Sequence, residues 1–252
     1  MRLDLYLVEK GYFKSRSKAK TAIDGNVVMI NGNIVNKSSF EVDNSDNIEI
    51  VADINPYVSR GGLKLEAAIK EFYLDFCNKV IVDIGASTGG FTDCSLKHGA
   101  KKVYAIDVGT NQLAEELLNN SKVISLEQTN ILDVEFFPEK IDYFVMDVSF
   151  VSIEHLLPGI NKFITDDNSL VCLIKPQFEV GKQYMKNGIV KDRTVHIRVI
   201  ENVLKELEKY NLGIAKLIPS PILGGSGNKE FLALIKRNIK NNINIVEVCS
   251  KE

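Results

Sequence analysis

The sequence lacks an excess of charge of either sign, since 31 lysines and arginines stand against 33 aspartates and glutamates and give a formal net charge of -2. A balance this close to neutrality does not by itself indicate a nucleic-acid partner, so such a prediction must rest on local charge. The content of 45% hydrophobic and 25% charged residues is that of an ordinary globular protein. A chain of 252 residues can form one large domain together with a small one.

Patterns that would indicate a metal site, a disulfide framework or a membrane segment are also missing. The cysteines and histidines are Cys77, Cys94, Cys172, Cys249, His98, His155 and His196. None of them has the spacing of a metal site, so we expect reduced thiols and no bound metal. No apolar run approaches the roughly 18 residues that span a bilayer, and the N-terminus does not resemble a signal peptide. We therefore expect a cytoplasmic protein without stable membrane association.

The first 50 or so residues predict a small α+β region. Leu3, Leu7 and Val8 begin a helix that ends near Gly11, and Ser15 is a suitable N-cap for a second helix that ends at Gly25-Asn26. The segment VVMINGNIV predicts a hairpin, because Asn-Gly favours a tight two-residue turn between strands. A further strand is expected at residues 48–51.

Basic residues gather at the start of this region. Residues 1–20 hold six basic and two acidic side chains, whereas residues 21–50 hold one lysine and five acidic side chains. A phosphate at the start of the second helix would also meet free backbone N–H groups. A solvated helix face is the alternative interpretation. The candidate RNA-binding residues are Arg2, Lys14, Arg16, Lys18 and Lys20.

The pattern RLDLYLVEKG followed by SRSKAKTAIDGNVVMINGNIVNK resembles the αL RNA-binding module, also called the S-four domain. Arg-Leu-Asp, Ser-Arg-x-x-Ala and Gly-x-Val ahead of Asn-Gly carry the resemblance. It implies RNA binding through the charged helix. We expect this domain at residues 1–51.

A break and a different pattern follow. Pro56 and Gly61-Gly62 interrupt regular structure, so residues 52–59 are predicted to be an interdomain linker and residues 60–252 a second domain. In the second domain, short apolar strands alternate with helices, which predicts an α/β fold with a parallel sheet covered on both faces. Strands are expected at 80–84, 103–107, 123–126, 143–147, 170–175, 214–218 and 231–235, and helices include 152–163 and 194–210. Only a loop separates the last two strands, so we expect an antiparallel pair with the final strand at the edge of the sheet.

The stretch DIGASTGGF follows the first strand of the second domain, where ligands bind in such sheets. Its glycines would let the backbone approach a ligand, but they match neither the dinucleotide fingerprint nor a Walker loop. Asp107 ends the next strand, 24 residues after Asp83, where a carboxylate can accept both ribose hydroxyls. This combination favours S-adenosylmethionine. NAD, or a tight turn that holds no ligand, is the alternative.

Four ionisable residues are predicted to lie at the same edge of the sheet. Lys64 begins the helix before the first strand, Asp147 and Lys175 end the fourth and fifth strands, and Glu230 opens the last. Taken singly, Lys64 could be an exposed lysine, Glu230 an edge-strand charge, and Asp147 with Lys175 a plain ion pair.

Together these residues resemble the Lys-Asp-Lys-Glu set of the FtsJ-type 2'-O-ribose methyltransferases. With DVSFVSI, KPQFEVGK and GSGNKEF in order behind the RNA-binding module, the chain is similar to the TlyA family over roughly residues 2–236. That resemblance implies a Rossmann-like methyltransferase sheet, S-adenosylmethionine as cofactor, and methylation of cytidine ribose in 23S and also 16S ribosomal RNA within ribosomal subunits. It implies the catalytic residues Lys64, Asp147, Lys175 and Glu230. The implied cofactor-binding residues are Asp83, Gly85, Ala86, Ser87, Thr88, Gly89, Gly90, Phe91, Asp107 and Asn130.

The chemistry requires in-line placement of a weak nucleophile, the ribose 2'-hydroxyl, against a methyl group that is already electrophilic. Lys175 is expected to contact that hydroxyl. It could act as a base only if desolvation and Lys64 favoured its neutral form, whereas Asp147 favours the ammonium form. We therefore expect Lys175 to orient the hydroxyl and stabilise its developing charge, with Asp147 holding Lys175 and Glu230 holding Lys64 or the ribose.

Other activities fit the sequence less well. Methylation of an exocyclic amine would need an Asp/Asn-Pro-Pro-aromatic turn, and base C5 methylation a cysteine nucleophile, whereas Cys94 and Cys172 are expected to be packed thiols. The family has also been called haemolysin, but no amphipathic insertion segment is evident. An RNA-binding protein with a non-catalytic cofactor site is the remaining alternative. The linker departs from the family, because Asn55-Pro56-Tyr57-Val58 replaces an Arg-x-Trp-Val pattern, and tyrosine is a smaller anchor.

Overall fold

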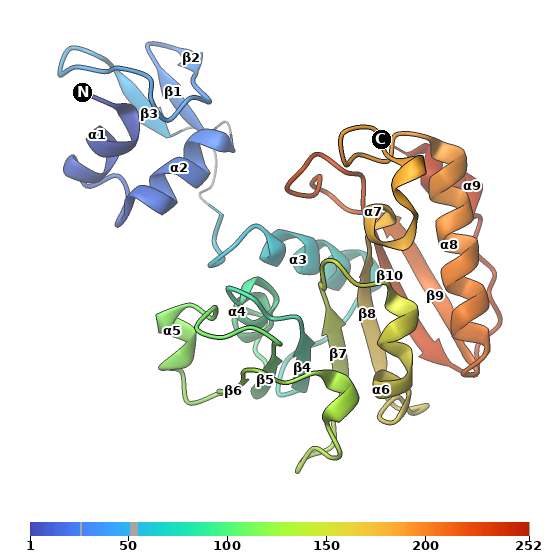
Figure 1. The fold of residues 1–252 in the computed structure, drawn as a ribbon. Helices are drawn as coiled ribbons and strands as arrows, with labels where there is room; N and C mark the ends of the chain where they lie inside the picture. The colour runs from blue at the N-terminus through green and yellow to red at the C-terminus, as the bar shows by residue number, and fades with distance from the viewer. Residues whose placement is uncertain (26, 51–54, 252) are drawn as a thin grey trace. The chain divides into compact units, whose positions relative to one another are not determined.

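The computed structural model describes residues 1–25, 27–50 and 55–251, which form two compact units, Met1–Pro56 and Tyr57–Glu252 (Figure 1). The predicted linker at 52–59 falls across this division, and its residues 52–54 lie outside the described part of the chain. Among the described residues, no helix combines the length and apolar character needed to cross a bilayer.

The first unit packs two helices against a small antiparallel sheet. Helices α1 (Leu3–Glu9) and α2 (Arg16–Asp24) are followed by β1 (Val28–Ile30), β2 (Asn33–Ile34) and β3 (Ile48–Ile50), in the sheet order β2-β1-β3. The predicted cap is present, because the Ser15 side chain accepts a hydrogen bond from the Lys18 backbone N–H at 3.3 Å. Asn31 and Gly32 have φ of 51° and 80°, the left-handed pair that the predicted two-residue turn requires.

The second unit contains a seven-stranded sheet in the order β6-β5-β4-β7-β8-β10-β9. Its strands are β4 (Val80–Ile84), β5 (Lys102–Ile106), β6 (Val123–Leu126), β7 (Tyr143–Met146), β8 (Ser169–Ile174), β9 (Leu212–Pro219) and β10 (Phe231–Arg237). The first five are parallel, and β10 runs antiparallel to both β8 and β9.

The predicted antiparallel pair is therefore present, but its outermost strand is β9 and not the final strand β10. Burial explains the order. Residues 231–235 of β10 are all buried, as a strand with neighbours on both sides and layers on both faces requires, whereas β9 carries the exposed Ala215 and the half-buried Lys216.

Helices cover both faces of this sheet (Figure 1). They are α3 (Gly61–Phe72), α4 (Gly90–Lys97), α5 (Glu115–Leu118), α6 (Leu157–Asn161), α7 (Pro176–Glu179), α8 (Arg193–Glu208) and α9 (Ile245–Ser250), with 3-10 turns η1 (Ile131–Asp133), η2 (Ile153–His155) and η3 (Lys182–Tyr184). Alternate strand residues feed two cores: Val82 packs in the cluster with residues of α8, and Ile81 in the cluster with residues of α3 and α4. The helix predicted at 152–163 is divided into η2 and α6, because Pro158 cannot donate a hydrogen bond within a continuous helix.

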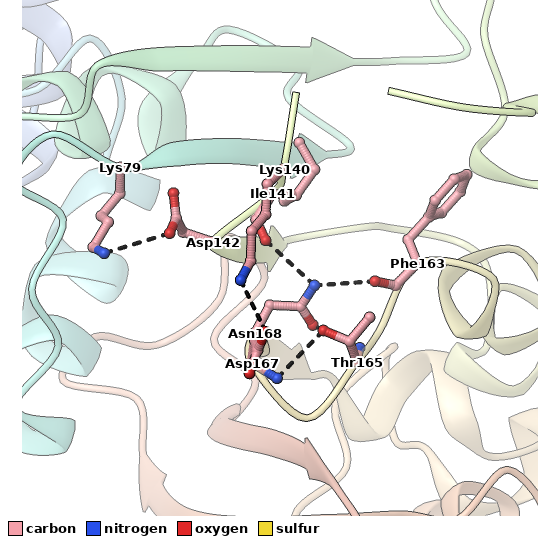
Figure 2. Close-up of polar contacts among 8 residues, drawn as sticks. All are labelled: Lys79, Lys140, Ile141, Asp142, Phe163, Thr165, Asp167 and Asn168. Carbon is pink, nitrogen blue, oxygen red and sulfur yellow. Dashed lines mark hydrogen bonds and ion pairs between the residues drawn. The ribbon is translucent and has the colours of Figure 1, made fainter. Parts of the chain in front are cut away.

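A polar network closes the amino-terminal edge of the sheet (Figure 2). The buried Asn168, which precedes β8, donates hydrogen bonds to the carbonyl oxygens of Ile141 and Phe163 at 3.3 and 3.0 Å. Asp142, which precedes β7, accepts from the Val80 backbone N–H at 2.9 Å and lies 3.4 Å from Lys79 Nζ. These contacts satisfy buried polar groups where three strands begin, so we interpret them as structural. The opposite edge holds the residues predicted to be functional.

Candidate active site

The glycine-rich loop at residues 85–91 leads from β4 into the first two residues of α4 at the carboxyl edge of the sheet. Gly85, Ser87 and Gly89 have φ of 78°, 47° and 95°, so the loop is built from left-handed conformations. A Cβ atom on Gly85 would lie 2.8 Å from Val148 Cγ1, and one on Gly89 would lie 2.2 Å from Leu117 Cδ1. Any side chain larger than that of glycine would therefore clash within the protein itself at these two positions. This reason for glycine is separate from the close approach of a ligand that the sequence predicted.

Asp83 lies beneath this loop and is fully buried. Its Oδ2 accepts a hydrogen bond from Thr92 Oγ1 at 2.7 Å, while its Oδ1 has no hydrogen-bond partner in the described part of the chain. Burial raises the pKa of Asp83 to about 7; the Thr92 hydrogen bond opposes this shift, and the nearby charge of Asp147 adds to it. Asp83 lines neither of the two pockets at this edge of the sheet, so the structure places it behind the loop and not at its surface.

Asp107 and Asn130 lie beside the loop in fixed orientations. The Asp107 carboxylate follows β5 and accepts hydrogen bonds from the backbone N–H groups of Ser87 and Gly109, both at 2.7 Å. Asn130 caps η1 by accepting from the Leu132 backbone N–H at 3.0 Å. Both residues line a pocket of about 590 Å³, the size of site that small-molecule cofactors occupy.

A second pocket of about 430 Å³ adjoins the first. Its walls include most of the glycine-rich loop, namely Gly85, Ala86, Ser87, Thr88, Gly90 and Phe91. The two pockets share the lining residues Gly85, Ser87, Asp147 and Ser149, so they are direct neighbours. Lys64 and Lys175 face the second pocket, and Gly89 instead packs against Leu113 and Leu117.

The structure brings the four predicted catalytic residues together. Lys64 Nζ lies 2.6 Å from Glu230 Oε2 and 4.0 Å from Asp147 Oδ2. Lys175 Nζ lies 2.6 Å from Asp147 Oδ1. Lys64 and Lys175 are each 8% exposed and Glu230 is 2% exposed, so the charges are largely withdrawn from water.

Fold topology explains this meeting of distant residues. Asp147 and Lys175 directly follow the parallel neighbours β7 and β8, whose carboxyl ends lie side by side. Glu230 directly precedes β10, which runs antiparallel to β8 and therefore starts at the same edge. Lys64 reaches them from the first turn of α3. Two amines balance two carboxylates, so the set as a whole is neutral.

Two further polar side chains contact this set and were not predicted. Lys175 Nζ donates a hydrogen bond to Ser149 Oγ at 2.8 Å, and Gln177 Nε2 donates to Glu230 Oε1 at 3.0 Å. Each follows a predicted residue by two positions. That spacing after a strand end is the only sequence signal that could have indicated them.

An exposed aromatic ring stands at the rim of the larger pocket. Phe150 is 91% exposed, has a left-handed φ of 65°, and its ring centroid lies 5.0 Å from that of Phe178. A large apolar side chain held in solvent by a strained backbone is unusual away from binding sites.

The cysteines do not supply a nucleophile for this site. Cys94 and Cys172 are buried within α4 and β8, and burial raises the pKa of the Cys94 thiol to about 12 and that of Cys172 well above its ordinary value. The interpretation of both as packed thiols agrees with this placement.

The predicted RNA-binding residues are exposed on the first unit. Arg16, Lys18 and Lys20 lie on α2, whose Ala19, Ala22 and Ile23 are buried. Arg2 and Arg16 both bond to the buried Asp4. Lys14, Lys18 and Lys20 have no acidic partner within 4.0 Å among residues 1–25, 27–50 and 55–251, so their charge is available to an anionic ligand.

Comparison with known proteins gives the same division of the chain. Residues 57–237 match the FtsJ-like methyltransferase family, and residues 1–48 match the S4 domain. The chain is 45% identical to Hemolysin A of Brachyspira hyodysenteriae, over 92% of this chain and 98% of that protein. It is 36% identical to the 16S/23S rRNA (cytidine-2'-O)-methyltransferase TlyA of Mycobacterium tuberculosis, over 93% and 89% of the two chains.

A solved structure shows the same architecture over almost the whole chain. It is described as a putative hemolysin from Streptococcus thermophilus and is 39% identical, with a TM-score of 0.78 over 99% of this chain and 94% of that one. Family matches to both parts of the chain, and relatives that are similar over nearly their full length, agree with the arrangement of the site. The chain belongs to the TlyA family of FtsJ-like methyltransferases that carry an S4 domain.

Proposed function

We propose that this protein transfers a methyl group from S-adenosylmethionine to the ribose 2'-hydroxyl of a cytidine in 23S ribosomal RNA, with 16S ribosomal RNA as a second substrate. The observation that carries the proposal is the contact of Lys175 with Asp147 and of Lys64 with Glu230 at the wall of the second pocket. The names of the relatives in Mycobacterium tuberculosis and Campylobacter jejuni, both cytidine-2'-O-methyltransferases, support the substrate class.

The residues around the larger pocket fit the proposed cofactor. Asp107 can accept hydrogen bonds from ribose hydroxyls, and Asn130 can contact the adenine. The backbone N–H groups of Thr88 and Gly90, which line the second pocket, can hold a carboxylate. Asp83 is buried beneath the same loop and accepts a hydrogen bond from Thr92 of α4, so we assign it to supporting the loop. When bound, S-adenosylmethionine supplies an electrophilic methyl group.

The neighbouring residues then have the task of holding the hydroxyl in place. The Lys175 ammonium contacts Asp147 and Ser149 and can donate a further hydrogen bond to the ribose oxygen. The carboxylate at 2.6 Å stabilises the charged form of the amine, so we assign Lys175 to orienting the nucleophile and stabilising its developing negative charge. Lys64 adds a second positive charge, which Glu230 and Gln177 hold in position.

The remaining features suit a folded RNA substrate. Phe150 offers an exposed ring on which a nucleobase can stack, and the first unit supplies the basic face for the surrounding RNA. The protein would act on ribosomal subunits in the cytoplasm.

Ribosomal RNA from a strain that lacks the gene provides the test. Primer extension at low deoxynucleotide concentration detects 2'-O-methylation as a stop, and treatment of isolated subunits with protein and cofactor should restore a stop at one cytidine of 23S ribosomal RNA and at one of 16S ribosomal RNA. Mass spectrometry of the fragment should place the methyl group on the sugar. A methyl group on the base, or no methyl group despite cofactor binding, would reject the proposal.

A further inference from the structure

Asp4 joins Arg2, the residue that precedes α1, to Arg16, the first residue of α2. Arg2 donates to it from Nε and Nη2, at 3.0 Å to Oδ1 and 3.2 Å to Oδ2, and Arg16 donates from Nη2 to Oδ2 at 2.8 Å. Asp4 is 3% exposed, whereas the side chains of Arg2 and Arg16 are 47% and 59% exposed. The carboxylate is thus covered, whereas the two arginine side chains that bind it are about half exposed to solvent.

Electrostatics alone would not favour an acid at this position. Lys14, Lys18 and Lys20 are exposed in the same unit, and a negative charge in that unit weakens its attraction for an anion. The hydrogen bonds from Arg2 and then Arg16 hold the pKa of Asp4 well below its usual value, so the carboxylate stays ionised throughout the physiological range.

Fold stability gives only a partial reason for Asp4. The contact between α1 and α2 is already made by a core that includes Leu3, Leu7, Ala19 and Ile23. Ion pairs to arginines that are half exposed add about 0–1 kcal/mol each. The apolar core, and not the acid, is the main connection between the helices.

Arginine geometry gives a fuller reason. A free arginine side chain samples many rotamers, and fixing it on a phosphate loses up to about 2 kcal/mol of rotamer entropy. Asp4 engages three guanidinium N–H groups, and the rest of the ten have no acceptor among the described residues. Both guanidinium groups are therefore ordered in advance, and most of their donors face outward in a planar arrangement suited to phosphate.

We infer that Asp4 is a positioning residue for RNA, which holds Arg2 and Arg16 as a preformed pair of phosphate-binding groups. The inference rests on the proposed function, because it takes RNA as the ligand of the first unit. It assigns to a buried acid a favourable effect on the binding of a polyanion. The negative charge of Asp4 alone would instead weaken the affinity for RNA.

The direction of the change in RNA affinity on replacing Asp4 tests the inference, with the full-length protein and 23S ribosomal RNA transcribed in vitro. In Asp4→Asn the arginine contacts are weakened and one negative charge is lost. The control is Glu9→Gln, which loses the same charge. Glu9 is an exposed acid of the same helix and has no ion-pair partner among the described residues. Affinity is measured by filter retention between about 50 and 300 mM KCl. We expect Asp4→Asn to bind about three- to tenfold more weakly than the wild type, and Glu9→Gln to bind equally well or slightly more tightly.

The possible outcomes are distinct. Equal gains in affinity for Asp4→Asn and Glu9→Gln would overturn the inference, because Asp4 would then act only as an unfavourable charge. If Asp4→Asn does not fold, Arg2→Lys and Arg16→Lys replace it, since they keep the charge and remove the planar fork; undiminished affinity of both would also overturn the inference. Failure of the wild type to bind the RNA at all would reject the RNA-binding part of the proposed function instead.

Discussion

Lys175 and Asp147 form a short ion pair, with 2.6 Å between Nζ and Oδ1, across the carboxyl ends of two parallel strands. Neither residue has much freedom to move, since Lys175 is also bonded to Ser149 and Asp147 lies within 4.0 Å of Lys64. The pair fixes the Lys175 amine at the wall of the second pocket. Such a group is ready to receive a hydroxyl oxygen without reorganisation.

Replacing Lys175 with alanine should therefore remove most methyl transfer. We expect kcat to fall by about 10²- to 10⁴-fold, the range typical for a positioned group that stabilises charge in the transition state. Transfer of a radiolabelled methyl group to ribosomal subunits measures the effect. Lys175→Arg should not restore activity, because a guanidinium group is larger and planar and cannot take the place of the ammonium between Asp147 and Ser149.

Cofactor binding provides the control for this variant. Calorimetry should show that Lys175→Ala binds S-adenosylmethionine about as well as the wild type, since the larger pocket does not include Lys175. Undiminished labelling of the ribose by the alanine variant would show that the chemistry takes place elsewhere.

Gln177 should contribute through Glu230. Replacing it with leucine removes the 3.0 Å hydrogen bond to Glu230 Oε1 and leaves that buried carboxylate with less support. We expect kcat to fall about three- to twentyfold, with little change in the KM for the cofactor. Gln183→Leu, an exposed glutamine in η3, is the matched control and should behave as the wild type. A loss seen in KM alone would contradict a role in supporting Glu230.

The meeting of Asp147 and Lys175 could be predicted because strand ends are read directly from apolar runs. Residues that follow parallel strands must share one edge of the sheet. Lys64 comes from a helix and Glu230 precedes an antiparallel strand, so strand ends alone do not place them. The catalytic roles of all four residues remain predictions. Ser149 and Gln177 could not be predicted, because the direction of a polar side chain just past a strand depends on backbone angles that the apolar pattern does not define.

The order of the last two strands shows a similar limit. Chain order suggested that β10 would form the edge, and only the burial of all residues from 231 to 235 places it between β8 and β9. Likewise, the sequence predicted that the glycines face a ligand. The structure adds that Gly85 and Gly89 also face Val148 and Leu117, which are distant in sequence.

Gly89→Ala should accordingly destabilise the protein. The new Cβ atom would meet Leu117 Cδ1 at 2.2 Å and Leu113 Cδ1 at 2.8 Å, at a φ of 95° that alanine rarely adopts. We expect a loss of about 2–4 kcal/mol in the free energy of unfolding, from overpacking and backbone strain together. Denaturant titration measures it.

Gly188→Ala separates the two causes. Gly188 has a φ of 77°, but its Cβ atom would have no neighbour within 4 Å among the described residues, so it reports strain alone. We expect it to lose about 1 kcal/mol. Equal losses for the two variants would contradict the assignment of Gly89 to packing against Leu113 and Leu117.

Asp83 should make stability depend on pH in an unusual direction. Its pKa is raised to about 7 in the folded protein from 3.8, chiefly by burial, so the folded state holds the proton more tightly than the unfolded state. The stabilising contribution is full below about pH 4 and is lost as the pH rises through about 7. At pH 8, where Asp83 is ionised, the free energy of unfolding is therefore lower than below pH 4, by on the order of a few kcal/mol.

Asp83→Asn removes this dependence, because the amide keeps an acceptor for Thr92 and cannot ionise. The quantity to compare is the melting temperature of the variant minus that of the wild type, measured without cofactor. This difference should be several degrees larger at pH 8 than at pH 5. Asp133→Asn, at an exposed acid in η1, controls for the loss of one carboxylate. If the difference between Asp83→Asn and the wild type is the same at both pH values, Asp83 does not carry a proton in the folded protein at pH 5.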